Sequence, residues 1–369
     1  MTATAPALSP TGRPSRLATL FLALAALSFH TGCTTFGYLA QAGAGQLDLG
    51  LRSRKIAHVI ADPATPPRLR ELLSQVRAIK AFGERQGLTP TSSYNDYVAL
   101  DRSVVVYVVT ASEPLRFHSK TWSFPIAGRV PYLGWFNRDD AHAFADGLRD
   151  EGWDADVGGA SAYSTLGWFK DPILSTMIPD GDEAPGDLAE VVLHESLHAT
   201  IYVNGQSSFN ENLASFVGEG LCRRYLDERF GPASAEKGAY ERAEAEGRAR
   251  RAAMHETYDR LKALYASARP DTEKLSEKSR ILIDLRAKIG FKRPINNATL
   301  AGLETYHEGS PELEALLTAC GGSFPRFLAA MKTVEGRSFG KELERDLGKV
   351  VRPLIEKGCI GRAREPAHD

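Results

Sequence analysis

The sequence has no excess of charge of one sign and no long apolar run. Its 45 Lys and Arg residues nearly balance 46 Asp and Glu residues, giving a net charge of −1 over 369 residues. Nucleic-acid-binding domains usually carry a basic patch and a high isoelectric point, so no nucleic-acid partner is expected. A glycine-rich phosphate-binding loop is also missing. The longest apolar run, Leu17–Phe29, is too short for a permanent membrane-spanning helix, which needs about 20 residues.

Cysteine is scarce, because the chain has only four, and no two of them have CxxC spacing. A zinc site built from cysteines is therefore not expected. Cys320 and Cys359 could form a disulfide in an oxidising compartment. Cys222 follows a predicted helix, and we expect a buried, unreactive thiol there. The hydrophobic content of 43% and the charged content of 25% suit one large or two modest globular domains.

The N-terminal residues have the composition of a secretory signal peptide. Arg13 and Arg16 precede the apolar run, and the predicted signal peptide covers residues 1–32. Thr31-Gly32-Cys33 resembles a bacterial lipobox, in which Cys33 would be lipidated and become the new N-terminus. His30 occupies a position that is usually aliphatic, so ordinary signal-peptidase cleavage is the alternative. We therefore predict a lipid-anchored protein of the bacterial cell envelope that faces the periplasm.

Residues 194–198 form the motif His-Glu-Ser-Leu-His at the end of an apolar stretch. A helix is predicted here, with Gly186-Asp187 as its N-cap and Gly205 as its stop. His194 and His198 then lie on one helical face, one turn apart, where both imidazoles can bind one zinc ion. Glu195 can reach a metal-bound water and act as a general base. The spacing therefore predicts a Zn²⁺ site with hydrolytic chemistry.

A catalytic zinc site needs a third protein ligand and an open fourth position. A second helix is predicted over Phe209–Gly220, and its Asn210-Glu211-x-x-Ala214 sequence resembles the NExxA element of zincins that use a glutamate ligand. Small residues on this helix would allow close packing against the first. Glu211 is therefore the preferred third ligand. Glu219 is the alternative, either as the ligand or as the group that binds the free amine of a peptide substrate.

Alternating strands and helices precede the histidine helix, and helices dominate after residue 205. The best strand pattern is Ser103–Val109, which is apolar enough to be buried on both faces. The pattern predicts an α+β fold with a mixed sheet beside the histidine helix. The other expected elements are a helix over Leu69–Gln86, an extended stretch over Thr121–Val130, a helix over Asp139–Glu151, a strand over Trp153–Val157, and a surface helix with i,i+4 ion pairs over Glu236–Arg269.

Several longer blocks resemble the bacterial predicted aminopeptidases, a family of zincin-like lipoproteins with an HExxH motif. The most specific block is Ala162–Pro172, which contains Tyr-Ser-Thr-Leu-Gly-Trp-Phe and is far more selective than HExxH alone. The resemblance covers roughly residues 33–350. The other matching blocks are Gly37–Ala42, Lys120–Gly128, Val130–Phe136, Phe209–Glu211 and Asn296–Ala298.

The resemblance implies a zincin-like metallopeptidase whose substrate is a peptide. It also suggests the organisation of the chain: an N-terminal α/β part at 33–155, a zincin-like catalytic part with a helical C-terminal region at 156–360, and a tail at 361–369. Zincins commonly bind a peptide along a strand edge near the metal helix. The segment expected to do this consists of Tyr163, Ser164, Thr165, Leu166 and Gly167. The alternative is an aromatic strand that packs in the core.

A zinc peptidase also needs a donor for the oxyanion that forms during hydrolysis. Tyr306 is the preferred candidate, and Tyr202 and Tyr163 are alternatives. The functional prediction is a zinc-dependent aminopeptidase in which Glu195 is the general base. Two other possibilities remain at this point. The protein could be a non-catalytic envelope lipoprotein with a structural or vestigial zinc site, or a zinc endopeptidase that acts on envelope proteins.

Overall fold

The computed structural model describes residues 37–124, 128–162, 170–304, 310–344 and 346–359. The residues predicted for lipidation, for peptide binding and for oxyanion stabilisation (Cys33, Tyr163–Gly167 and Tyr306) lie outside these ranges. The chain divides into two compact units, residues 1–48 and residues 49–369. In the first unit, residues 37–48 are helical. The division at residue 155 that was predicted from the sequence stays a prediction.

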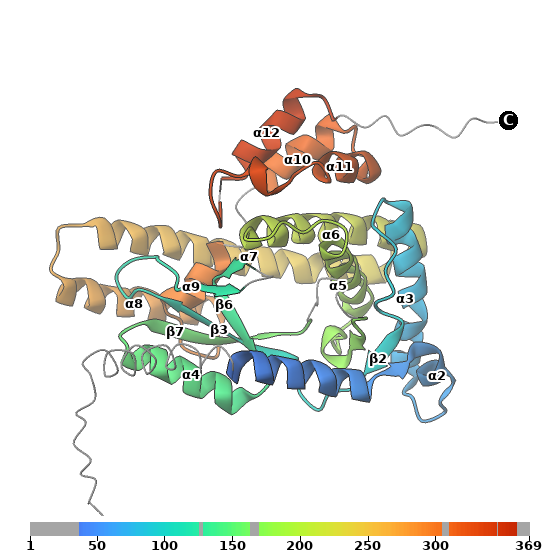
Figure 1. Cartoon of the computed structure of the whole chain (residues 1–369), viewed down its shortest axis with the longest axis horizontal. Helices are drawn as coiled ribbons and strands as arrows, with labels where there is room; N and C mark the ends of the chain where they lie inside the picture. Colours follow the sequence, from blue (N-terminus) through green and yellow to red (C-terminus); the bar gives the residue numbers. More distant parts are fainter. Residues whose placement is uncertain (1–36, 125–127, 163–169, 305–309, 345, 360–369) are drawn as a thin grey trace, which may run out of the picture. The chain divides into compact units, whose positions relative to one another are not determined.

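The second unit is an α+β structure in which helices predominate (Figure 1). Its helices are α2 (Ile56–Ala61), α3 (Pro67–Arg85), α4 (Arg138–Asp150), α5 (Ala184–His198), α6 (Ser207–Phe230), α7 (Ala235–Ala266), α8 (Asp271–Ile289), α9 (Asn297–Glu304), α10 (Ser310–Ala319), α11 (Phe324–Met331) and α12 (Gly348–Glu356). Its strands are β1 (Arg54–Lys55), β2 (Asp96–Val98), β3 (Val106–Ser112), β4 (Trp122–Phe124), β5 (Gly128–Val130), β6 (Tyr132–Trp135), β7 (Asp154–Ala160) and β8 (Ile173–Leu174).

The described strands form three small sheets rather than one large sheet. The first has the order β1-β2-β8 and is mixed, because β1 pairs antiparallel and β8 pairs parallel with β2. The second is antiparallel with the order β6-β3-β7, and β4 and β5 form a two-stranded ribbon. The single extended stretch predicted over Thr121–Val130 is therefore wrong in part, since it contains two paired strands separated by residues 125–127.

Strand β3 begins at Val106 and continues to Ser112, so the predicted strand was placed three residues too early. Helices cover both of its faces, as its apolar composition suggested. Val109 and Ala111 pack in a cluster with residues of α4. Thr110 points the other way, and its hydroxyl donates a hydrogen bond to the carbonyl of Ala298 in α9 (3.4 Å). Strand β3 is also the central strand of its sheet, because it pairs with β6 on one side and with β7 on the other.

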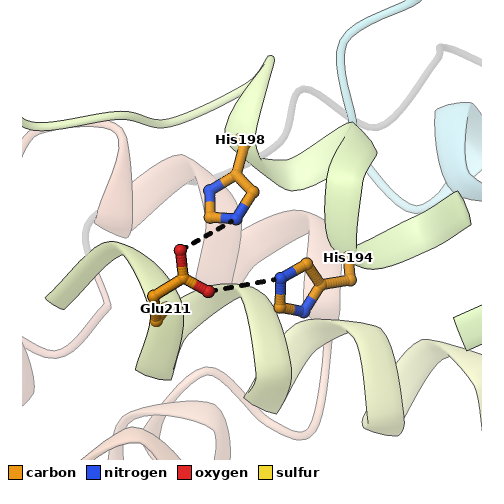
Figure 2. Close-up of side chains that lie close together, drawn as sticks. All are labelled: His194, His198 and Glu211. Atoms are coloured by element: carbon orange, nitrogen blue, oxygen red, sulfur yellow. Dashed lines mark ion pairs between the residues drawn. The ribbon is translucent and has the colours of Figure 1, made fainter. Parts of the chain in front are cut away.

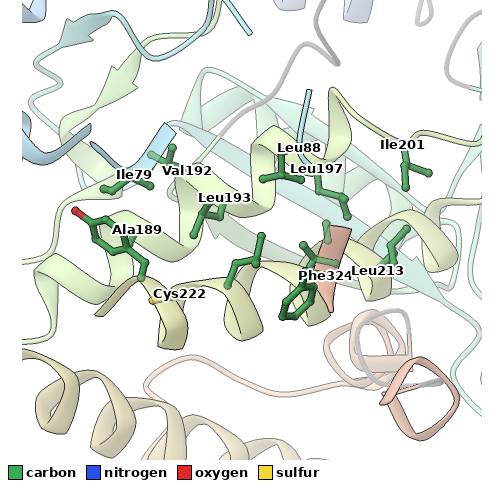
Figure 3. Packing of buried hydrophobic residues seen from close by; sticks show 14 of the residues in the cluster. Ile79, Leu88, Ala189, Val192, Leu193, Leu197, Ile201, Leu213, Cys222 and Phe324 are labelled. Atoms are coloured by element: carbon green, nitrogen blue, oxygen red, sulfur yellow. The ribbon is translucent and has the colours of Figure 1, made fainter. Parts of the chain in front are cut away.

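The main hydrophobic core surrounds α5, which packs against α3, α6 and α7. Figure 3 shows Val192 and Leu193 of α5 among side chains from neighbouring helices. The packing of α6 against α5 is very close, because a Cβ atom at Gly218 would lie 3.1 Å from the Cβ of His194. The sequence predicted this close packing from the small residues of α6. It brings the two helices that carry the predicted ligands into direct contact.

Helix α5 begins earlier than the sequence suggested. Its first residue is Ala184 and Pro185 occupies its first turn, a position that suits the fixed backbone of proline. The predicted N-cap at Gly186-Asp187 is therefore wrong. Gly186 is instead a point of close approach, because a Cβ there would lie within 2.6 Å of the Tyr240 ring in α7. The predicted stop at Gly205 is also wrong, since α5 ends at His198.

Helix α7 confirms the predicted surface helix, with bounds that differ by a few residues. It runs for 32 residues and has ion pairs at i,i+4 spacing, such as Arg248–Glu244 at 3.8 Å. The end of α7 and α8 form a second, smaller core with Ile295 and Leu300. This cluster is separate from the core around α5.

The disulfide Cys320–Cys359 joins the residue after α10 to the segment after α12. It confirms the pairing predicted from the sequence. Phe324 and Phe327 of α11 pack on Phe216 of α6. Cys222 is a buried free thiol, as expected. The disulfide therefore closes a segment whose aromatic side chains rest on the helix that carries Glu211.

We expect the double substitution Cys320→Ser, Cys359→Ser to lower the free energy of unfolding by about 4 kcal/mol, because the disulfide restricts a loop of about 40 residues in the unfolded chain. Urea unfolding of the oxidised protein and of the variant measures the difference. A reducing agent should bring the wild-type protein to the stability of the variant and leave the variant unchanged. A difference below about 1 kcal/mol would contradict this prediction.

Candidate metal centre

His194 and His198 occupy the last turn of α5 and lie on the same face of the helix. Their ring centroids are 5.0 Å apart. His198 is 6% exposed, and the side chain of His194 is 18% exposed. The i,i+4 spacing and the apolar residues around it place both imidazoles against α6 rather than in open solvent. Two neutral imidazoles at this spacing are the usual helical part of a zinc site.

Glu211 projects from the second turn of α6 between the two rings (Figure 2). Its Oε2 atom lies 3.6 Å from His194 Nε2, and its Oε1 atom lies 3.7 Å from His198 Nε2. One ligand atom from each of these three residues lies within 4.8 Å of the others. In the described part of the chain, no other cluster of His, Cys, Asp or Glu meets this condition.

The separation of the three donor groups fits a bound zinc ion. Zn–N and Zn–O bonds of about 2.1 Å at tetrahedral angles put two ligand atoms about 3.4 Å apart. The distances from Glu211 to His194 and His198 are only slightly longer than this value. The donor set of two imidazoles and one carboxylate is also that of many catalytic zinc sites. The cluster could therefore hold a metal ion.

The charges in the cluster are coupled through Glu211. Burial lowers the pKa of His198 to about 4, so this imidazole is neutral at pH 7 and has a lone pair for a metal. Burial acts in the same direction on His194, but a hydrogen bond that its ring donates to Glu211 and the charges of Glu195 and Glu211 raise its pKa overall. Burial would raise the pKa of Glu211, yet the two histidines hold it below its usual value.

Glu195 immediately follows the first histidine and is 9% exposed. It lies close enough to Tyr94 for its charge to contribute, after burial, to the raised pKa of that phenol. Tyr94 is 3% exposed and has a φ of 64°, a left-handed conformation that is uncommon for an aromatic residue. Such backbone strain is concentrated at functional sites. The sequence contained no signal for Tyr94, because it lies 101 residues before Glu195.

Glu190 is another titratable neighbour that the sequence did not single out. It precedes His194 by one helical turn, and Tyr240 donates a hydrogen bond to its Oε2 atom (2.8 Å). Burial, together with the charges of Glu244 and Glu219, raises the pKa of Glu190 to about 7. The region beside His194 is therefore acidic and only partly ionised at neutral pH.

The alternative ligand Glu219 is not part of the three-residue cluster. It lies two helical turns beyond Glu211, about 12 Å along α6, and pairs with Arg223 at 3.1 Å. Tyr202 is half-buried, and the charge of Glu211 contributes, after burial, to the raised pKa of its phenol. The structure thus brings His194, His198 and Glu211 together, with Tyr202 near them, and places Glu219 elsewhere on α6.

The fold and the cluster define an α+β protein with a His-His-Glu group that can hold a metal ion. Residues 37–345 match the model of a family described as "Putative aminopeptidase". Because the match covers most of the chain, this protein belongs to that family. No significant match was found among curated proteins or among solved structures. The family supports peptidase activity in general, and the predicted family resemblance is confirmed.

We expect Glu211→Gln to weaken zinc binding by about 10- to 100-fold or more, because the substitution removes a charged ligand oxygen from a buried site. Glu219→Gln is the matched control, since it makes the same chemical change on the same helix. Its zinc affinity should stay within about twofold of wild type. Competition with a chromophoric chelator measures both affinities. Equal losses in the two variants, or a loss only in Glu219→Gln, would show that the third ligand is misassigned.

Proposed function

We propose that this protein is a zinc-dependent aminopeptidase whose zinc is held by His194, His198 and Glu211. The observation that carries the proposal is the position of the Glu211 carboxylate between the two histidines. Its Oε2 atom lies 3.6 Å from His194 Nε2, and its Oε1 atom lies 3.7 Å from His198 Nε2. Membership of the family described as "Putative aminopeptidase" supports the reaction class. The arrangement of an HExxH helix with a glutamate on a following helix also supports a zincin-like site.

Zinc in such a site supplies Lewis acidity, which polarises a peptide carbonyl and makes water a usable nucleophile near neutral pH. The other steps belong to residues of the chain. The Glu195 carboxylate accepts a proton from the attacking water and then delivers that proton to the nitrogen of the leaving group. Glu195 is 9% exposed, so its carboxylate lies at a mostly buried position beside His194. His198, neutral because of its burial, would bind the metal without first losing a proton.

The remaining roles in the reaction stay proposals. Tyr306 is proposed as the oxyanion donor, with Tyr202 as the rival because its phenol lies near Glu211. The segment Tyr163–Gly167 is proposed to pair with the substrate backbone. Glu219 is proposed to bind the free amine of the substrate, since its charge acts on Glu190 beside His194.

A catalytic site is favoured over a structural one by the number of ligands. Structural zinc sites are closed by four protein ligands, whereas catalytic sites use three and leave one position open. In the residues that the structure describes, the metal-binding group has three members. This count favours the peptidase over a lipoprotein in which zinc only stabilises the fold.

The proposed location is the bacterial cell envelope, with the protein anchored through a lipidated Cys33. In the described residues, no helix is long and apolar enough to cross a membrane. The helical residues 37–52 follow Cys33 closely, and Leu39, Leu47 and Leu51 are 51%, 63% and 78% exposed. Exposed leucines so close to an anchored cysteine suit contact with a lipid surface. The disulfide also suits an oxidising compartment.

We expect Glu195→Gln to keep its zinc and to lose peptide hydrolysis by at least about 10³-fold, because the amide cannot accept the proton of the attacking water. Metal analysis and hydrolysis of a peptide amide are measured on the same preparation. Glu190→Gln is the matched control on the same helix and should retain most of the activity. Undiminished cleavage by Glu195→Gln would exclude this residue as the general base.

Peptides with a free amino terminus should be cleaved at least about 100-fold faster than their N-acetylated forms, because acetylation removes the charge that an acidic group would bind. The measurement compares kcat/KM for matched pairs of peptides and identifies the products by mass spectrometry. Equal rates with internal cleavage would instead assign an endopeptidase. Glu219→Gln should reduce the preference for the free amine if this residue binds it.

A further inference from the structure

The side chain of Asn210, the residue before Glu211, forms hydrogen bonds with the backbone of the loop between α5 and α6. Its Oδ1 atom accepts a hydrogen bond from the amide of Val203 (2.9 Å), and its Nδ2 atom donates one to the carbonyl of the same residue (2.9 Å). Asn210 is 2% exposed, so both bonds are shielded from water. The pair of bonds fixes the start of α6 relative to Val203 in the loop that follows α5.

Gln206, just before the first residue of α6, connects the same loop to a distant part of the chain. Its Nε2 atom donates to the carbonyl of Lys341 (2.7 Å), and its Oε1 atom accepts from the amide of Glu344 (3.0 Å). The amide of Leu343 donates to the carbonyl of Gly205 (2.9 Å). Gln206 is 3% exposed. Three hydrogen bonds thus join the loop to residues 339–344, which we call the C-terminal clamp.

The backbone of the C-terminal clamp is strained at the point of contact. Leu343 has a φ of 52°, a left-handed conformation that non-glycine residues rarely adopt. Gly205 opposite has a φ of 75°, and a Cβ there would lie 3.4 Å from Glu342 Cγ. Strained residues persist only where the surrounding structure holds them in place. The hydrogen bonds of Gln206 and of the Leu343 amide are the contacts that hold Leu343 in this conformation.

An aromatic contact extends the connection into α6. The rings of Phe339 in the clamp and Phe209 in α6 meet edge to face, with centroids 5.1 Å apart. Phe209 is fully buried and precedes Glu211 by two residues. Beyond the clamp, Cys359 closes the C-terminal segment through its disulfide with Cys320. The first turn of α6 is therefore fixed on one side by the loop from α5 and on the other by the clamp.

We infer that Gln206 is a positioning residue for the candidate metal centre: its carboxamide ties the C-terminal clamp to the start of α6 and so holds Glu211 where it can share a metal ion with both histidines. The inference rests on the zinc site proposed above. Ligands must be held within about 0.5 Å of their productive positions for full affinity. If the carboxamide is lost, α6 keeps its apolar packing, but its first turn, which leads directly into Glu211, gains freedom.

The test measures zinc affinity in the full-length protein by chelator competition, with zinc as the only added ligand. Gln206→Glu keeps the size and the acceptor of the side chain but cannot donate to Lys341. Gln206→Met keeps the length and removes both bonds. We expect each variant to bind zinc about 10- to 100-fold more weakly. Peptide hydrolysis should fall at limiting zinc and recover in excess zinc, because the chemical groups are intact.

Asn297→Asp is the matched control for a general loss of stability. Asn297 is a fully buried amide whose Nδ2 atom donates to the carbonyls of Glu113 (2.8 Å) and Pro114 (3.1 Å), away from the metal cluster. Its conversion to the acid should lower the melting temperature and leave zinc affinity unchanged. Gln206→Met is the second variant if the charge of Gln206→Glu prevents folding.

The possible outcomes separate the inference from the proposed function. Wild-type zinc affinity in both Gln206 variants would overturn the positioning role and leave the zinc site in place. A loss of affinity in Asn297→Asp equal to that in the Gln206 variants would also overturn it, since the effect would then follow general stability. A wild-type protein that binds no zinc would overturn the metal centre itself, and the positioning role with it.

Discussion

The packing of α6 against α5 is the constraint on which the rest of the site depends. A glutamate can reach two histidines on a neighbouring helix only if the helices touch, and Gly218 allows this because a side chain there would meet the Cβ of His194 at 3.1 Å. The apolar core around Val192 and Leu193 then holds α5 in place. Burial has a second effect, because it removes water from the cluster and makes the His198 imidazole neutral. The same packing therefore sets both the geometry and the protonation state of the candidate ligands.

Much of this site could be predicted from local sequence, because its main signals are short. The four-residue spacing of His194 and His198 places them on one helical face in any α-helix. The Asn210-Glu211 pair and the small residues after it indicated the second helix and favoured Glu211 over Glu219. Only the structure places Glu211 between the histidines and Glu219 beside Arg223. The prediction of the two histidine ligands therefore depended almost entirely on the period of the α-helix.

The parts that sequence did not predict depend on contacts between distant residues. Gly186 resembled a cap, yet its lack of a side chain serves the approach of Tyr240, 54 residues later. Gln206 belongs to no motif in the sequence, and its hydrogen-bond partners lie 135 and 138 residues away. Tyr94 has no local signal at all. The strands were also misplaced by a few residues, because apolar runs do not specify which backbone groups pair.

Asn210 shows that the Asn-Glu motif includes a structural residue as well as the candidate metal ligand Glu211. Its side chain forms two hydrogen bonds with Val203 and none of the ion pairs in the cluster, so its role is to shape the turn that leads into α6. An aspartate there would keep the acceptor, lose the donor and bury a charge that has no cationic partner among the described contacts. The Asn-Glu pair is thus a structural unit, in which the first residue fixes the loop and the second faces the histidines. The C-terminal clamp contacts the same loop through Gln206 and Gly205, so a segment far along the chain supports the turn that leads into Glu211.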